Sequence, residues 1–322
     1  MNPCYHLLLS VLLATVCIIP ADVSGQRFRT PDNFKTYYPI IENPNFLLMS
    51  PYKQDDPILF EANPAVNYSF VNNIQYNLET GEPYGYAAYF SYKPQVRMYA
   101  SVSKPVRMPS YRIQPGFQYI HRLGNVIQKD PSVSMPRRSR FLSIAIESGH
   151  YSNGQNRCAF SASLEDGSEG CIDIYRSINS STNLSDLLNR SSGNFSTNLT
   201  EVVVSYQYNK HTLRDDNGIP LVSRRIYFGT VMYHEFFSLV MPVRFGGYSD
   251  EDIDLYGKWR FHISYEQLNI LNDRGPGEHA RYGVFNTKVE YILNPHPHVV
   301  PVRIETSYEY YPWSGSDIGF KL

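Results

Sequence analysis

WRFHISY, residues 259–265, is the stretch that decides the fold class of this chain. Apolar and polar side chains alternate in it, and a period of two is typical of a β-strand, whose successive side chains point to opposite faces. We expect the apolar face of this strand to be buried. That face carries Trp259, Phe261, Ile263 and Tyr265.

The same alternation recurs elsewhere in the second half of the chain. Val202, Val204 and Tyr206 alternate with smaller or polar residues, and Asn217-Gly218 follows before a second apolar run. Because Asn-Gly supports positive φ, residues 201–233 are predicted to form an antiparallel hairpin. Further strands are predicted at 141–147, 172–175, 236–243, 282–293 and 299–310.

Helix signals are scarce, and the best of them is the short stretch 264–272. Short strands separated by Gly, Pro and Asn turns predict an all-β, antiparallel β-sandwich or jelly-roll-like fold. Proline is denser in residues 26–140 than in residues 141–322. Because proline removes a backbone donor and fixes φ, it disfavours long helices and well-paired central strands. We therefore expect a Pro/Tyr-rich region of short strands and loops at 26–140 and a β-rich domain at 141–322.

The first twenty-five residues are predicted to be a secretory signal peptide. Leu7 to Ile19 is an apolar run too short to span a bilayer, and Val23-Ser24-Gly25 supplies small residues for cleavage before Gln26. No later stretch reaches about 18 consecutive apolar residues, so we expect no membrane span. The last residues are polar, which predicts a released, extracellular protein.

Six Asn-x-Ser/Thr acceptors for N-linked glycans support export of the chain. They are Asn67, Asn179, Asn183, Asn189, Asn194 and Asn198. Ser, Thr and Asn dominate residues 177–200, and such a composition cannot bury apolar surface. We expect this segment to be an exposed glycosylated loop outside the core.

Two cysteines remain after Cys4 and Cys17 leave with the signal. These are Cys158 and Cys171, which are expected to form a disulfide in an oxidising compartment. Two free buried thiols are the alternative. The bond would close a short loop and contribute roughly 3 kcal/mol.

Charge and motifs exclude several function classes. The chain has 29 Lys and Arg against 30 Asp and Glu, so there is no electrostatic case for nucleic acid binding. No cofactor fingerprint occurs, and no metal site is predicted. His296-Pro297-His298 lacks a third ligand, His234-Glu235 lacks the second His of a zinc helix, and the acidic run 250–254 lacks the glycine of a calcium loop.

Catalytic motifs are equally weak. There is no Gly-x-Ser-x-Gly elbow and no free mature thiol, which favours a non-enzymatic protein. A dispersed carboxylate pair is the remaining enzymatic option. Glu147, Glu290, Glu305 and Glu309 lie on predicted strands, where a solvent-facing role is the default.

Two surface features are candidates for function. The chain has 27 Tyr, and Tyr308, Tyr310 and Trp313 form a dense aromatic cluster that could bind a ligand. If Tyr308 and Tyr310 share one face of a strand, Tyr311 points to the other. The run from Arg137 to Arg140 fits the minimal pattern of secretory convertases, with Arg140 as a possible processing site in a linker.

These patterns favour a secreted, non-enzymatic glycoprotein that acts by binding or assembly in an extracellular matrix, coat or fluid. Its expected partner is an extracellular protein or glycan. The alternatives are a secreted carbohydrate-active hydrolase and a secreted ligand for a cell-surface receptor. Two facing carboxylates in a cleft would favour the hydrolase, and an aromatic face would favour binding or assembly.

Overall fold

The computed structural model is almost entirely β-structure where the chain is described. Compactness divides the chain into Met1–Thr30 and Pro31–Leu322, and every described element belongs to the second unit. The described residues are 45–48, 58–99, 110–124, 138–152, 196–210, 222–239, 242–244, 250, 253–254, 257–272, 281–295, 300–311 and 319–321.

The strands lengthen towards the middle of the chain, and a short helix precedes the first long one. The elements are β1 (Asn45–Leu48), β2 (Ile58–Asn63), β3 (Val66–Asn72), α3 (Ile74–Thr80), β4 (Tyr84–Tyr99), β5 (Ser110–Arg122), β6 (Arg138–Ser152), β7 (Ser196–Lys210), β8 (Val222–His234), β9 (Trp259–Asn272), β10 (Arg281–Ile292), β11 (Val302–Tyr311) and β12 (Gly319–Lys321).

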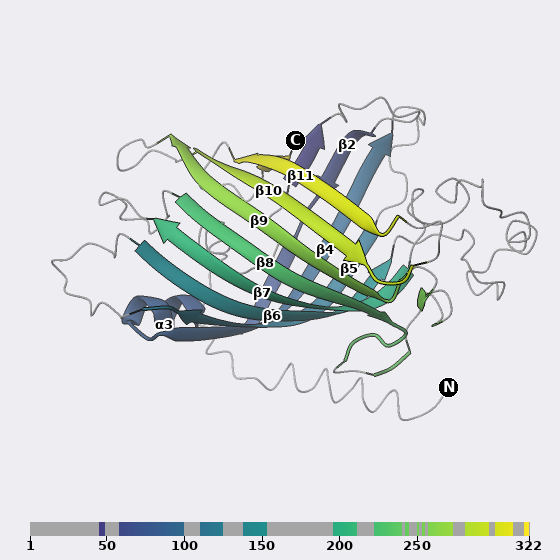
Figure 1. Ribbon diagram of the computed structural model, residues 1–322, viewed down its shortest axis with the longest axis horizontal. Helices are drawn as coiled ribbons and strands as arrows, with labels where there is room; N and C mark the ends of the chain where they lie inside the picture. The colour runs from purple at the N-terminus through teal and green to yellow at the C-terminus, as the bar shows by residue number, and fades with distance from the viewer. Residues whose placement is uncertain are drawn as a thin grey trace, which may run out of the picture. The chain divides into compact units, whose positions relative to one another are not determined.

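All described strands belong to one sheet, in the order β2-β1-β12-β11-β10-β9-β8-β7-β6-β5-β4-β3. From β4 to β11 each strand pairs antiparallel with the next in the chain, and the β1–β12 pair is parallel. β2 also pairs with β4, beyond the stretch of β4 that pairs with β3, so the ladder closes on itself. In Figure 1 the strands from β6 to β11 form a curved front layer, with β2, β4 and β5 crossing behind it.

The antiparallel, sandwich-like all-β prediction is confirmed, and both layers come from one continuous sheet. The hairpin predicted at 201–233 is β7–β8. The strands predicted at 141–147, 282–293 and 299–310 are found within β6, β10 and β11. The weak helix signal at 264–272 is wrong, because these residues pair with strands on both sides. The described part of 236–243 holds an isolated bridge, and 172–175 lies outside the described residues.

Proline does not keep the strands of the region before residue 140 short. β1, β2 and β3 are short, but β4 and β5 have 16 and 13 residues. Pro94 pairs with Tyr111 of β5, and on the other side of β4 it lies between the parts that pair with β3 and β2, where no described strand is its partner. The ladder also continues through Arg140, because β6 pairs with β5 and β7.

The β5–β6 ladder has an interruption that accommodates a second proline. Pairing stops at Ile113↔His150 and resumes at Gly116↔Glu147, and Pro115 lies in between. The two backbones approach closely here, since a Cβ on Gly149 would lie 2.0 Å from the Ile113 carbonyl oxygen. Gly149 is therefore required by the close approach.

Buried side chains define one side of the sheet, which we call the inner face. α3 packs there, with Ile74 and Leu78 in a cluster with Ala87, Ile120 and Phe141. Gly85 permits this contact, because a Cβ there would lie 2.5 Å from the Ile74 Cα. Two smaller apolar clusters lie further along the inner face. They are Ala145, Val203 and Tyr227, and Leu268, Tyr282, Val284 and Tyr311.

Candidate functional site: an apolar outer face around a polar inner face

The opposite side of the sheet, the outer face, carries a continuous row of exposed apolar side chains across eight consecutive strands. Each member is the direct cross-strand partner of the next, and their exposed fractions run from 36% to 74%. The row, in strand order from β4 to β11, is Tyr86, Tyr119, Ile144, Val204, Phe228, Ile263, Val289 and Ile304.

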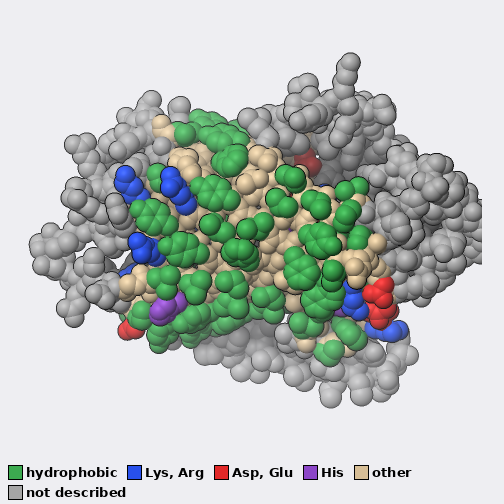
Figure 2. Space-filling view, viewed as in Figure 1, with side chains coloured by type: hydrophobic (Ala, Val, Ile, Leu, Met, Phe, Trp, Pro, Cys, Tyr) green, Lys and Arg blue, Asp and Glu red, His purple; other side chains and the backbone are tan. Residues whose placement is uncertain are grey.

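A second row runs beside the first, two residues along each strand. It consists of Ala88, Phe117, Ile146, Val202, Thr230, Phe261, Tyr291 and Val302. We call the sixteen positions of the two rows the outer belt. Figure 2 shows hydrophobic side chains spread over this side of the molecule.

The register of the outer face also passes through the strands that close the sheet. Tyr310 pairs with Phe320 of β12, Phe320 with Phe46 of β1, Phe46 with Ala62 of β2, and Ala62 with Val96 of β4. These pairs therefore link β11 back to β4.

The orientation of β9 corrects the sequence prediction. Trp259, Phe261 and Ile263 are 39%, 42% and 46% exposed. The intervening Arg260, His262 and Ser264 are buried instead. Tyr265 shares the outward register and is half-buried. The predicted alternation is confirmed, but the prediction that its apolar face is buried is wrong, because that face is the outer one.

Tyr308 and Tyr310 lie together on the outer face, while Tyr311 is fully buried on the inner face beside Tyr282. The predicted division of these three tyrosines between two faces is thus confirmed. Trp313 lies outside the described residues.

The outer belt is energetically costly in water. Burying one large apolar side chain contributes about 1.5–3 kcal/mol. If each side chain of the first row forgoes about half of that, the row alone forgoes roughly 10 kcal/mol, comparable with the net stability of ~5–15 kcal/mol of a typical domain. Apolar patches of this extent mark interaction surfaces.

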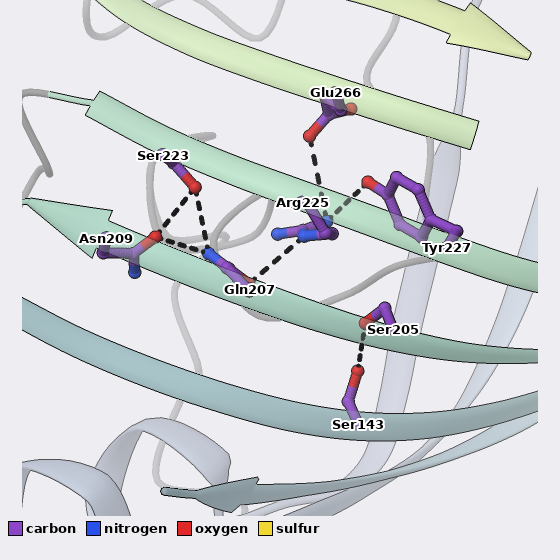
Figure 3. Close-up of polar contacts among 8 residues, drawn as sticks. All are labelled: Ser143, Ser205, Gln207, Asn209, Ser223, Arg225, Tyr227 and Glu266. Atoms are coloured by element: carbon purple, nitrogen blue, oxygen red, sulfur yellow. Dashed lines mark hydrogen bonds and ion pairs between the residues drawn. The ribbon is translucent and has the colours of Figure 1, made fainter.

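The inner face carries a hydrogen-bonded polar network centred on Arg225 (Figure 3). Cross-strand pairing places Gln207, Arg225 and Glu266 side by side. Arg225 Nε donates to Gln207 Oε1 at 3.2 Å, and its Nη1 lies 2.9 Å from the Tyr227 hydroxyl and 3.9 Å from Glu266 Oε1. A buried guanidinium is thereby paired.

Further contacts extend this network along β7 and β8. Gln207 Nε2 donates to Asn209 Oδ1 at 2.9 Å and to Ser223 Oγ at 3.2 Å. Ser223 Oγ donates to Asn209 Oδ1 at 2.8 Å. Ser143 and Ser205 share a hydrogen bond of 2.6 Å one step away. The network is made of side chains that would otherwise be buried without partners.

A second polar centre lies at Glu147, which is fully buried. Its Oε1 accepts a hydrogen bond of 3.0 Å from the Tyr89 hydroxyl, and its Oε2 lies 3.2 Å from Lys93 Nζ. The solvent-facing default for Glu147 is therefore wrong. The same holds for Glu309, which is buried and accepts a hydrogen bond from Tyr311.

Two more carboxylates contact side chains of β9 on the inner face. Arg260 Nη1 lies 3.5 Å from Glu290 Oε1, so Glu290 also faces inward. His262 Nε2 lies 3.7 Å from Glu201 Oε1. Glu305 is exposed, as expected. Glu147 and Glu290 thus lie beside the cations Lys93 and Arg260, and Glu147 is also the direct cross-strand partner of Glu201.

Beyond one edge of the belt, the outer face becomes polar and is covered. Ser148, Thr200 and His234 are buried and joined in series, at 2.7 Å from Ser148 Oγ to Thr200 Oγ1 and at 2.8 Å from Thr200 Oγ1 to His234 Nε2. The Leu239 N–H donates to Ser148 Oγ at 3.1 Å, so the segment after β8 folds back here.

Asn198 and His150 lie beside this polar edge. His150 Nδ1 lies 2.7 Å from Asn198 Oδ1, and Asn198 Nδ2 donates to the Glu235 carbonyl oxygen at 3.0 Å. Burial lowers the pKa of both His150 and His234, because it disfavours the imidazolium form. The uncharged rings are therefore favoured at this edge.

The end of the predicted glycan loop at 177–200 overlaps the start of β7. Residues 196–200 belong to β7, and Asn198 is 1% exposed with its amide nitrogen engaged. Asn67 lies within β3 and is half-buried. The acceptors Asn179, Asn183, Asn189 and Asn194 lie outside the described residues, as do Cys158 and Cys171.

Arg140 is exposed but does not lie in a linker. It is part of β6, pairs with Tyr208, and its carbonyl oxygen accepts a hydrogen bond from the Leu123 N–H. A convertase binds an extended, unpaired segment, so this setting does not suit cleavage.

Within the described ranges, no group of three or more His, Cys, Asp or Glu side chains could hold a metal ion. In the same part of the chain, no helix has both the length and the apolar character needed to cross a membrane. No family model matches the chain, and neither a curated protein nor a solved structure is similar to it.

Sequence reasoning identified the alternating strands but missed the inner polar network. The available signal was the chemistry of the second face, because Ser205, Gln207 and Asn209 recur at every second position of β7. A strand of an ordinary sandwich would send such residues to water.

Proposed function

We propose that this protein is a non-enzymatic, membrane-embedded β-protein whose outer belt contacts lipid acyl chains. The observation that carries the proposal is the inversion of the two faces, with apolar side chains outside and charged, hydrogen-bonded side chains inside. Lipid is the surrounding phase that makes such an arrangement favourable, since acyl chains cover apolar groups on all sides while the inner face keeps its own polar contacts.

The geometry of the sheet supports lipid as the occupant. The belt passes over eight strands of a closed ladder, so a protein partner would have to surround the sheet to cover it. Apart from the interruption between β5 and β6, these strands form continuous ladders with their neighbours, as a lipid environment demands. Strands β4 to β11 have 10 to 16 residues, and a tilted strand needs about 9–11 to cross the hydrocarbon layer.

A secreted, non-enzymatic glycoprotein that binds an extracellular protein or glycan is the second candidate. The tyrosines of the outer face favour it, because Tyr binds such partners well. In that case the belt would be covered by protein or glycan, and the chain would be stable without detergent. The predicted signal peptide at 1–25 agrees with both candidates, since each requires export.

The experiment compares two adjacent aromatic residues on opposite faces of β8. Phe228 is 59% exposed on the outer face, and Tyr227 is buried on the inner face. The chain has two tryptophans, Trp259 and Trp313, and both would be replaced by Phe. Phe228→Trp and Tyr227→Trp would then each be introduced alone and reconstituted in vesicles of acyl-brominated phosphatidylcholine.

Strong bromine quenching of the Phe228→Trp variant, with weak quenching of the matched Tyr227→Trp variant, is the expected result. Circular dichroism would establish that both variants keep their β-structure. Equal quenching of the two reporters would contradict the assignment of the outer face to lipid. A chain that is monodisperse in detergent-free buffer and does not bind vesicles would favour the secreted binding protein.

A further inference from the structure

The described charged side chains that point outward from the strands β4 to β11 lie at one end of the outer belt. Among the described side chains at outward positions of β4 to β11, the Lys, Arg, Asp and Glu residues are Arg140, Lys210 and Arg224. We call these three the basic rim. All three are exposed, and all three are cationic.

The members of the basic rim lie on three adjacent strands at the same edge of the belt. Arg140 of β6 pairs with Tyr208 of β7, which pairs with Arg224 of β8. Lys210 lies two residues beyond Tyr208 on the same face. Since neighbouring strands lie about 4.8 Å apart, Arg140 and Arg224 are roughly 10 Å from each other. Figure 2 shows Lys and Arg side chains at two edges of the apolar surface, and at the lower right edge Asp and Glu side chains lie beside them.

The opposite edge of the belt has different chemistry. The outward residues there are the buried Ser148, Thr200 and His234, which hydrogen bond to one another. Cations near that edge are paired with carboxylates, because Arg244 lies 2.7 Å from Glu235 and Lys258 lies 3.7 Å from Asp250. The described outer face is therefore basic at one edge only.

We propose that the basic rim binds the phosphate groups of anionic lipids in one leaflet and so fixes the orientation of the protein. The inference rests on the proposed function, because the belt must first place the rim at headgroup depth. A basic side chain at a lipid surface attracts anionic headgroups with about 1 kcal/mol, which is roughly fivefold in affinity. Two guanidinium groups suit phosphate oxygens, which they can bind in a bidentate manner.

The test measures which lipids remain with the full chain. Wild-type protein in detergent would be mixed with equal amounts of phosphatidylglycerol and phosphatidylcholine of identical acyl chains. The protein would then be separated from free lipid by gel filtration, and the lipids that remain bound would be quantified by mass spectrometry. We expect phosphatidylglycerol to be enriched. In R140Q/K210Q/R224Q the enrichment should fall roughly tenfold or more, towards an equal ratio.

Two control variants separate charge from structure. R140K/R224K keeps the charge and should retain the preference for phosphatidylglycerol. R244Q/K258Q removes two cations near the other edge and should also retain it. Circular dichroism and gel filtration would verify that each variant is folded.

Each contrary result has a distinct meaning. A wild-type chain that retains both lipids equally, or a triple Gln variant that keeps its preference, would contradict anionic-lipid binding by the basic rim. Neither result would contradict the contact of the outer belt with acyl chains. Displacement of phosphatidylglycerol by millimolar inorganic phosphate would also overturn it, because the site would then recognise free phosphate. Retention of neither lipid would contradict both lipid binding by the basic rim and the proposed function.

Discussion

Phe261 and His262 are neighbours in β9 but lie on opposite faces, and it is the phenylalanine that is exposed. Phe261 is 42% exposed, while His262 is 9% exposed and lies 3.7 Å from Glu201 Oε1. In a sheet that packs its apolar side against a core, the two environments would be exchanged. In this pair the apolar side chain is exposed and the polar one is buried, which is the arrangement on which the functional proposals depend.

A charge in the outer belt should destabilise the lipid-embedded protein. Ile263 lies between Phe228 and Val289 in the first row, and I263K would place an ammonium among acyl chains. We expect a loss of about 2–4 kcal/mol in the free energy of unfolding, measured by guanidinium titration in vesicles. Q267K, on the same face of β9 near the basic rim, is the matched control and should cost less than about 1 kcal/mol. Equal effects would contradict the belt.

Arg225 and Arg224 should respond very differently to replacement by Ala. R225A leaves the partners Gln207 and Glu266 without their cation on the inner face, and we expect a loss of roughly 2–4 kcal/mol in unfolding free energy. R224A removes an exposed side chain and should change stability by less than about 0.5 kcal/mol. Urea or guanidinium titration of the two variants is the measurement. A large loss of stability in R224A but not in R225A would contradict the assignment of the inner and outer faces.

The Lys93–Glu147 pair should show strong coupling. K93M leaves the fully buried Glu147 carboxylate without its cation, which should cost about 3–5 kcal/mol. K93M/E147Q removes both charges and should recover most of that loss, because an uncharged pair needs no compensation. A double-mutant cycle of unfolding free energies tests this. Additive effects of the two substitutions would show that the pair is not coupled.

The polar edge should weaken as the pH falls. Burial lowers the folded-state pKa of His150 and His234 below the ordinary value of 6.5, so the unfolded chain takes up protons first on acidification. Their contribution to stability is therefore complete above about pH 6.5 and is lost as the pH falls towards the lowered folded-state pKa. Unfolding titrations between pH 8 and pH 5 should show this slope.

Replacing both rings by Gln should flatten that slope, because Gln does not titrate. The H150Q/H234Q variant keeps a hydrogen-bonding group at each position, next to Asn198 and Thr200. A slope that persists unchanged in this variant would assign the acid sensitivity to other groups.

Asn198 should carry no glycan in folded protein, although it stands in an acceptor motif. Its amide nitrogen donates to the Glu235 carbonyl oxygen and its side chain is buried, so a glycan would have to break this contact. Glycopeptide mapping of chain expressed through a eukaryotic secretory pathway should find Asn198 unmodified. An occupied Asn198 in correctly folded protein would contradict the placement of β7.

Strand positions could be predicted from the sequence because alternation is a local property. WRFHISY at 259–265 predicts β9, the pattern around Asn217-Gly218 predicts the β7–β8 hairpin, and alternation separates Tyr308 and Tyr310 from Tyr311. Proline was less informative than expected. Pro94 and Pro115 occur inside long strands, where pairing on one side of the strand is interrupted, and such positions depend on neighbouring strands.

The sequence by itself determined that each strand has an apolar side and a polar side, because side chains in a strand alternate strictly. Only the tertiary structure decided which side is inside. Closure of the ladder through β2 and β4 gives the sheet an interior, and the partners of Glu147 come from β4, which is not its neighbour in the chain. A period of two is unchanged when the faces are exchanged, so no local pattern distinguishes a sheet around an apolar core from one with an apolar exterior.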